Sequence, residues 1–210
     1  MIITAYQTQK ILPGEKLFEI LDSSLPELKE KDIVVVTSKI VSICQERVVK
    51  NDGTVDKEAL ILKEADFYIE DPSLSRYHVT LTIKDGVLIA NSGIDESNAN
   101  GLFVLWPREP FKEAQKIWQH IKTKHKLKHV GVLITDSRLI PLRWGTLGIG
   151  LAWCGFEPLR DYIGKPDIFG RKLRVTKQNV LDGLAAASVL VMGEGNEQTP
   201  LAVISDVTHV

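Results

Sequence analysis

The chain has 210 residues, of which 44% are hydrophobic and 25% are charged, an ordinary globular composition that suits one large domain or two small ones. Its 26 basic and 27 acidic side chains give a net charge of −1, which argues against a dedicated nucleic-acid-binding protein, because such proteins carry a basic excess. No apolar run reaches the roughly 18 residues that cross a bilayer, and the N-terminus lacks a signal-peptide pattern, so we expect a cytoplasmic protein with no nucleic-acid or membrane partner.

The first part of the chain alternates between helix and strand patterns. Apolar residues spaced as on one helical face predict helices over residues 15–25, 57–67 and 111–124. Runs rich in β-branched residues predict strands over residues 1–8, 32–37 and 102–106, the second of which continues through 39–44. The Asp85-Gly86 pair lies between two apolar runs and predicts a β-hairpin over residues 78–91, followed by a polar loop.

The last part of the chain mixes strands, turns and one long helix. A strand is predicted over residues 129–135, ending at Asp136, and a glycine-rich strand that packs closely against another backbone is predicted over 145–154. Turn residues predict a β-excursion over residues 159–175. Thr176 is a suitable N-cap for a helix over residues 177–192, and a final strand is predicted over 201–205. Because hairpins and crossovers both occur, the predicted fold class is α+β, with mixed and antiparallel sheets and flanking helices.

Two acidic loops carry hard oxygen atoms that suit a divalent metal. Asp95 lies in the loop G-I-D-E-S-N, where the amide of Asn98 could contact a base, sugar or phosphate. Asp136 follows a buried strand, a common place for ligands, and Ser137 adds a hydroxyl oxygen. Each acid has a structural alternative: Asp95 as an Asx turn that accepts only backbone N–H groups, and Asp136 as a simple strand end. Local sequence leaves both alternatives open.

A third polar loop, residues 192–197, follows the long predicted helix. Its glycines let the backbone approach a ligand closely, and Glu194 could complete a second metal position. Arg143, soon after Asp136, could neutralise charge that develops on a phosphate. A flexible surface turn and an ordinary surface arginine are the corresponding structural alternatives.

Several familiar kinds of site are not indicated. Cys44 and Cys154 lack C-x-x-C spacing, so neither a disulfide nor a structural zinc site is predicted. His120, His125 and His129 lie among lysines that repel a cation, and their spacing does not hold one helical face. The sequence contains neither G-x-x-x-x-G-K-[ST] nor G-x-G-x-x-G, so any nucleotide must be held by other means.

Six motifs occur in order and cover nearly the whole chain. They are V-V-V-T-S-K-I-V-S, G-V-L-I-A-N-S-G-I-D-E-S-N-A, L-I-T-D-S, R-W-G-T-L-G-I-G-L-A, P-L-R-D-Y-I-G-K-P-D-I-F-G-R-K-L-R-V-T and L-A-A-A-S-V-L-V-M-G-E. Together they resemble the coenzyme F-420 γ-glutamyl ligase family, and G-I-D-E-S-N-A is the most specific of them. The resemblance implies an intertwined α+β homodimer, built as a single unit over residues 1–210 with a β-rich excursion at about 138–175.

The resemblance also implies a GTP-dependent amide ligase that uses Mn²⁺ or Mg²⁺. Such a ligase couples L-glutamate to a carboxylate acceptor, such as a deazaflavin coenzyme precursor, through an acyl phosphate, and relies on positioning and charge neutralisation. The implied metal ligands are Asp95 and Asp136 for one ion and Ser137 and Glu194 for a second, with Arg143 as the catalytic residue. The implied nucleotide contacts are Thr8, Gln9, Lys10, Ile11, Ser38, Lys39, Asn98, Met192, Gly193 and Gly195, with the rest of the 192–200 loop.

Some positions depart from the family pattern. Ile43 stands where the family carries a lysine that contacts the nucleotide, and Q-E-R replaces E-G-R after it. The pattern D-T-F-G-R-P-x-R becomes D-S-R-L-I-P-L-R, so Leu139 and Ile140 replace a glycine and an arginine. Losing one charged phosphate contact typically costs about 1.5–3 kcal/mol. The alternative to a ligase is therefore a non-catalytic or repurposed relative that binds nucleotide, metal or another ligand without ligase activity.

Overall fold

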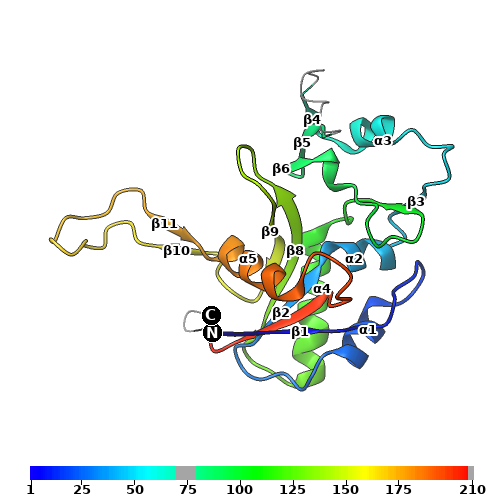
Figure 1. The fold of residues 1–210 in the computed structure, drawn as a ribbon. Coiled ribbons are helices and arrows are strands. Elements are labelled where there is room, and N and C mark those ends of the chain that lie inside the picture. Colours follow the sequence, from blue (N-terminus) through cyan, green and yellow to red (C-terminus); the bar gives the residue numbers. More distant parts are fainter. Residues whose placement is uncertain (70–78, 208–210) are drawn as a thin grey trace.

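The computed structural model describes residues 1–69 and 79–207, and its main sheet has five strands (Figure 1). Their order across the sheet is β1 (Ile2–Tyr6), β12 (Leu201–Ser205), β2 (Ile33–Thr37), β8 (Gly131–Leu139) and β9 (Thr146–Cys154). Strands β2 and β8 pair in parallel, and the other neighbours pair antiparallel. The sheet is therefore mixed, which confirms the predicted α+β class.

Helices cover both faces of this sheet. Helices α1 (Leu17–Ser24), α2 (Ser38–Cys44) and α4 (Pro110–His125) pack on one face, and α5 (Val180–Met192) packs on the other. Within the described residues no helix combines the length and apolar character needed to cross a membrane.

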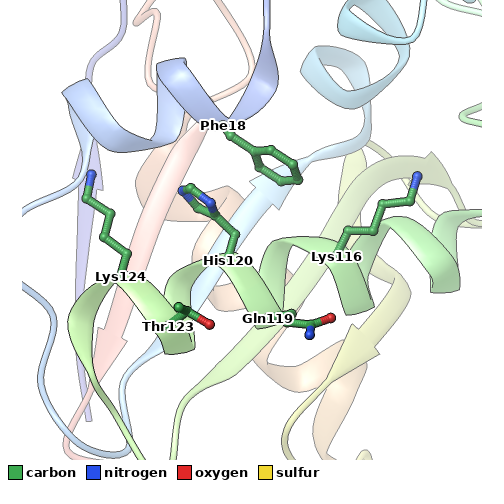
Figure 2. Close-up of a pocket in the computed structure, with 6 residues that line it drawn as sticks. All are labelled: Phe18, Lys116, Gln119, His120, Thr123 and Lys124. Atoms are coloured by element: carbon green, nitrogen blue, oxygen red, sulfur yellow. The ribbon is translucent and has the colours of Figure 1, made fainter.

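Helices α1 and α4 contact each other beside a shallow surface hollow of about 500 Å³, shown in Figure 2. The rings of Phe18 and His120 stack with their centroids 4.6 Å apart, and His120 Nε2 lies 2.7 Å from Asp22 Oδ1. His125 Nδ1 accepts a hydrogen bond from the Leu28 backbone N–H at 3.4 Å. These histidines therefore make structural contacts between elements.

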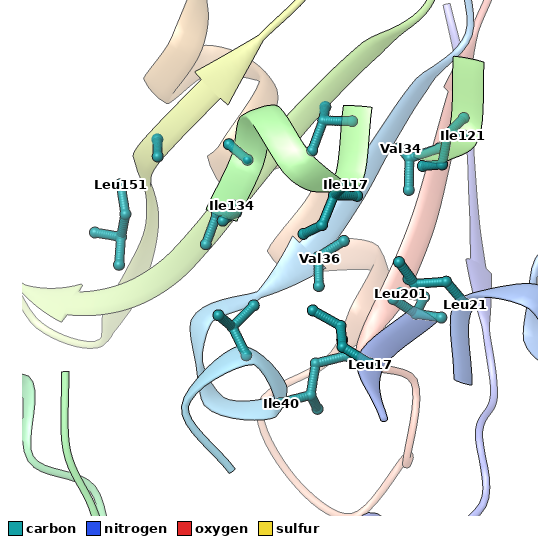
Figure 3. Packing of buried hydrophobic residues seen from close by; sticks show 14 of the residues in the cluster. Leu17, Leu21, Val34, Val36, Ile40, Ile117, Ile121, Ile134, Leu151 and Leu201 are labelled. Atoms are coloured by element: carbon teal, nitrogen blue, oxygen red, sulfur yellow. The ribbon is translucent and has the colours of Figure 1, made fainter. Parts of the chain in front are cut away.

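The core follows the two-residue period of the central strands. On β2, Val34 and Val36 pack into the cluster that α1, α2 and α4 cover (Figure 3), whereas Ile33 and Val35 pack against α5. All four side chains are fully buried, so both faces of β2 are apolar. Burying one such side chain contributes roughly 1.5–3 kcal/mol, and this two-sided burial fixes the register of the strand.

Two smaller sheets lie to one side of the main sheet (Figure 1). One pairs β3 (Val48–Lys50) with β7 (Leu102–Val104), and the other contains β4 (Phe67–Tyr68), β5 (Leu81–Lys84) and β6 (Val87–Ala90). Helix α3 (Lys57–Glu64) and the 3₁₀ turn η2 (Asn91–Gly93) join them. The predicted hairpin is confirmed between Leu81 and Ala90, while His78 lies outside the described residues.

A two-stranded arm extends away from the body of the molecule (Figure 1). It is formed by β10 (Leu159–Asp161) and β11 (Lys177–Asn179), and it confirms the β-excursion predicted over residues 159–175. The Asp167 side chain closes a turn by accepting hydrogen bonds from the backbone N–H groups of Phe169 and Arg171. Ile168 and Phe169 are 92% and 88% exposed, so the arm presents apolar side chains to solvent.

The predicted strand over residues 39–44 is wrong, because these residues form helix α2. Their β-branched side chains favour a strand in isolation, but burial on two sides decides otherwise. Ile40 and Val41 pack into the main core, and Ile43 packs into a separate cluster with Ala99 and Val104. A helix can reach both clusters at once, so tertiary packing overrides local propensity.

Two predicted boundaries are also wrong. Strand β8 does not end at Asp136 but runs to Leu139, because β9 pairs with it up to Leu139 opposite Thr146. Helix α5 does not begin after Thr176, because residues 177–179 pair with β10 as β11. The N-cap is Asn179, whose side-chain oxygen accepts a hydrogen bond from the Asp182 backbone N–H at 3.0 Å.

Candidate functional site

A cavity of about 1180 Å³ opens where the main sheet meets the smaller sheets. Its walls come from the loop after β1, the start of α2, the loop after β6, strand β8 and the loop after α5. The three polar segments that carry Asp95, Asp136 and Glu194 are far apart in the sequence, but they surround one space. The cavity is somewhat larger than the usual range for small-molecule sites, about 300–1,000 Å³, and is large enough for a nucleotide.

Asp136 lies on β8 with both carboxylate oxygens hydrogen-bonded. Ser38 Oγ donates to Oδ2 at 2.8 Å, and the Ser137 backbone N–H donates to Oδ1 at 2.7 Å. Burial raises the pKa of Asp136 to about 6, helped by the nearby Asp95 charge, although the two hydrogen bonds and Lys39 act in the opposite direction. The Asp136 carboxylate is therefore only partly compensated, and a further cation would stabilise it.

Asp95 lies across the same cavity and is ion-paired. Lys39 Nζ is 2.6 Å from Asp95 Oδ2, and the Ser97 backbone N–H donates to Oδ1 at 2.7 Å. Burial acts to raise the pKa of Asp95, but Lys39 and Ser97 outweigh it and hold the pKa below its ordinary value. The Asx turn considered for Asp95 is thus present, and the same carboxylate also faces the cavity.

Ser137 and Glu194 form a second group of oxygens. Ser137 Oγ lies 2.8 and 2.9 Å from the two Glu194 carboxylate oxygens, and Thr146 Oγ1 donates to Glu194 Oε1 at 3.0 Å. Successive residues of a strand project from opposite faces, so Ser137 meets the loop after α5 while Asp136 meets the start of α2. The four predicted ligands therefore fall into two pairs, Asp95 with Asp136 and Ser137 with Glu194.

Hydrogen bonds tie the loops around the cavity to one another. Asn98 Nδ2 donates to the Gly195 carbonyl at 2.8 Å, which joins the loop after β6 to the loop after α5. Thr8 and Gln198 exchange two hydrogen bonds, from the Thr8 backbone N–H at 3.1 Å and from Gln198 Nε2 at 2.6 Å. Every predicted nucleotide contact lines this cavity: Thr8, Gln9, Lys10, Ile11, Ser38, Lys39, Asn98, Met192, Gly193 and Gly195.

Arg143 does not line the cavity. It lies in the exposed turn between β8 and β9, beside Leu142 and Trp144, which are both fully exposed. Among the described residues, the arginine that lines the cavity is Arg138, which none of the sequence patterns indicated. Its position two residues after Asp136 on one strand is a signal that could have identified it, whereas the contribution of Thr146 depends on strand pairing.

The donor atoms fit a hard divalent cation. Across residues 1–69 and 79–207, no three or more His, Cys, Asp or Glu side chains gather closely enough to hold a metal ion by themselves. Each of the two pairs instead offers one or two carboxylates next to serine hydroxyls and an open cavity. Mg²⁺ is commonly held in this way, by one or two carboxylates and by oxygens of a bound phosphate.

Comparison with known proteins gives consistent matches. The family described as F420-0:γ-glutamyl ligase matches residues 6–206. A coenzyme F420:L-glutamate ligase of Methanococcus maripaludis is 35% identical over 190 residues, covering 84% of this chain and 76% of the relative. The protein of the same name from Haloarcula marismortui is 32% identical over 216 residues, covering 94% and 83%. That of Methanosarcina barkeri is 34% identical over 204 residues, covering 91% and 79%.

Proposed function

The chain belongs to the F420-0:γ-glutamyl ligase family, and we propose that it joins L-glutamate to the carboxylate of a deazaflavin coenzyme precursor, using GTP and a divalent metal. The observation that carries this proposal is the family match over residues 6–206, together with one cavity lined by all the residues for which the resemblance implies a nucleotide or metal contact. The names of the relatives support both glutamate and the F420 precursor as substrates.

The proposed reaction has two steps. A carboxylate oxygen of the acceptor attacks the γ-phosphorus of GTP, so that an acyl phosphate forms and GDP leaves. The amine of glutamate then attacks the acyl carbon, the amide bond forms, phosphate leaves and the amine loses a proton. Such chemistry depends on positioning and on neutralising the phosphate charge.

The proposed metal ligands lie on two sides of the cavity. Asp95 and Asp136 would hold one metal ion, and Ser137 and Glu194 would hold a second. A bound Mg²⁺ or Mn²⁺ would supply Lewis-acid neutralisation of phosphate charge. The partly compensated charge of Asp136 supports this assignment, because a cation would stabilise its ionised form.

The loops around the cavity would bind the nucleotide. The loop after α5 carries Gly193 and Gly195, which leave the backbone open to a ligand, and Asn98 fixes it by a hydrogen bond to Gly195. Lys39 supplies a positive charge at the start of α2. These features replace the phosphate-binding glycine motifs that the sequence lacks.

We also propose that the protein works as a homodimer. The arm formed by β10 and β11 projects from the body and exposes Ile168, Phe169 and Val175 almost completely. Apolar side chains grouped in this way are typical of surfaces that are buried in an assembly. A second copy of the chain is the proposed partner of this arm.

One observation favours a second candidate function. Ile43 lines the cavity but is 7% exposed and packed with Ala99 and Val104. This part of the wall therefore offers no charge to a phosphate. A relative that binds nucleotide without turnover would fit this apolar wall.

Calorimetric titration with GTP in the presence of Mn²⁺ or Mg²⁺ tests the proposed function. We expect GTP to bind the wild type, and Asp136→Ala to weaken metal-dependent binding strongly. Asp52→Asn, an exposed change outside the cavity, should bind like the wild type. Failure of GTP to bind with either metal would reject the ligase, while binding without glutamate-dependent phosphate release would favour the non-catalytic relative.

A further inference from the structure

The basic side chains of the cavity are not equivalent. Among the described residues that line it, three are basic: Lys10, Lys39 and Arg138. Lys39 is already paired with Asp95 at 2.6 Å and also donates to the Ser97 carbonyl at 3.0 Å. Lys10 lies in an exposed loop. Arg138 is held on a regular strand and is the best-positioned cation that is not already paired.

The Arg138 guanidinium carries a buried donor that has no partner among the described residues. Its Nε atom is shielded from solvent, and within the described part of the chain it has no hydrogen-bond acceptor. The side chain also forms no ion pair there with Asp95, Asp136 or Glu194, although all three acids line the same cavity. A buried donor left unsatisfied lowers stability, and such groups are rare in folded proteins.

Strand geometry sets the side of the cavity on which Arg138 lies. Asp136 pairs with Ile149 and Arg138 pairs with Leu147, in the regular part of the β8–β9 ladder. Alternate residues of a strand project from the same face, so Arg138 shares its face with Asp136 and not with Ser137. Arg138 therefore stands on the side of the Asp95–Asp136 pair.

A guanidinium in this position suits an oxyanion. Its N–H groups form a planar fork that matches the oxygens of a phosphate or a carboxylate. We propose that Arg138 binds an oxyanion of a bound substrate next to the Asp95–Asp136 pair, either a phosphate of the nucleotide or the carboxylate of the acceptor. The inference rests on the proposed function for the identity of that substrate, but the unpaired guanidinium does not depend on it.

The test compares the wild type with Arg138→Gln, which removes the charge, and Arg138→Lys, which keeps the charge without the fork. Each protein is titrated with inorganic triphosphate and with GTP, both with Mg²⁺, and the acceptor KM is measured. We expect Arg138→Gln either to weaken polyphosphate binding or to raise the acceptor KM, in each case about ten- to a hundredfold. The effect of Arg138→Lys should lie between those of the wild type and Arg138→Gln. A loss on triphosphate and GTP identifies the phosphate, and a loss confined to the acceptor KM identifies the carboxylate.

Arg108→Gln is the matched control, because Arg108 is exposed and lies outside the cavity lining. It should bind every ligand like the wild type. Thermal unfolding without ligand separates binding from a structural role: Arg138→Gln should melt at or above the wild-type temperature, since it removes an unpaired buried donor. A lower melting temperature with unchanged affinities and KM would overturn the inference, as would wild-type values in every titration.

Titration with inorganic triphosphate tests the role of Arg138 without assuming that the protein binds GTP. If the wild type binds triphosphate but not GTP, the nucleotide assignment fails, and the loss seen in Arg138→Gln still decides the role of Arg138. If the wild type binds neither polyphosphate and shows no acceptor turnover, both proposals fail.

Discussion

Single residues of the cavity carry charges that are only partly balanced. Among the described residues, Asp95 is ion-paired with Lys39, whereas Asp136 has hydrogen bonds but no cation in direct contact, and burial raises its pKa to about 6. Arg138 has the opposite imbalance: within the part of the chain that the structure describes, no acid forms an ion pair with it and its buried Nε has no hydrogen-bond acceptor. Both imbalances would be relieved by the proposed ligand, a phosphate bound together with a divalent metal.

The raised pKa of Asp136 has a definite consequence for stability. Its folded-state pKa of about 6 lies above the ordinary value of 3.8, so the group favours the folded state below the ordinary value and loses that contribution as the pH rises through about 6. Without metal, we expect the melting temperature of the wild type to fall between pH 4 and pH 7 relative to Asp136→Asn. Parallel melting profiles of the two proteins would contradict the assignment.

Added metal should reverse this trend, because the metal ion binds the ionised carboxylate. Mg²⁺ or Mn²⁺ affinity should weaken as the pH falls through about 6, where Asp136 becomes protonated. Calorimetric titrations with the metal at pH 5 and pH 7.5 measure this directly. Equal affinities at the two pH values would exclude Asp136 as a ligand.

Close packing between elements holds the walls of the cavity in place. The glycine-rich strand β9 lies against α5, as the sequence predicted. A Cβ atom added at Gly148 would lie 2.7 Å from the Ala185 carbonyl oxygen and 2.8 Å from Val189 Cβ. The helix could not remain at this distance from the strand if position 148 carried a side chain.

We therefore expect Gly148→Ala to lower the free energy of unfolding by about 1–3 kcal/mol through overpacking. Gly183→Ala is the matched control, because a Cβ atom there would meet nothing within 4 Å. Within helix α5 that change should stabilise by about 0.5–1 kcal/mol. Chemical denaturation of both variants measures the difference, and similar effects from the two substitutions would refute the packing argument.

The elements that the sequence predicted correctly are those with a clear local pattern, such as α4 and β2. Three segments were mispredicted where a distant partner decides the structure: α2, which reaches two clusters, the end of β8, which follows β9, and β11, which pairs with β10. Propensity is a local quantity, so it could not identify these partners.

The candidate site also contains residues that the local sequence could identify and residues that only the fold could identify. Asp95, Asp136 and Glu194 could be picked out individually as acids in suitable loops, but only the fold places them around one cavity. Thr146 was missed because its contact with Glu194 depends on the pairing register of β8 and β9. Arg143 was chosen from its closeness to Asp136 in sequence and from the family resemblance, but in this structure the turn between β8 and β9 carries it outside the cavity lining.

At the scale of the whole molecule, the arm is a projecting feature whose apolar side chains a single copy of the chain leaves exposed. Ile168 and Phe169 lie midway along the segment that joins β10 to β11 and are about nine-tenths exposed. We expect the wild type to sediment as a dimer and the double variant Ile168→Asp, Phe169→Asp to sediment as a monomer. Lys172→Gln, on the same arm, should remain dimeric. A wild-type monomer at micromolar concentration would contradict the proposed homodimer.

We propose above that the protein joins glutamate to an acceptor in its cavity while GTP is converted to GDP and phosphate. The most direct test incubates the protein with GTP, L-glutamate, the deazaflavin precursor and Mn²⁺, and follows the acceptor by mass spectrometry. We expect the acceptor to gain one glutamyl residue, with one GDP and one phosphate released for each, and we expect no product from Asp136→Ala. An unchanged acceptor in the presence of a wild-type protein that binds GTP would contradict it.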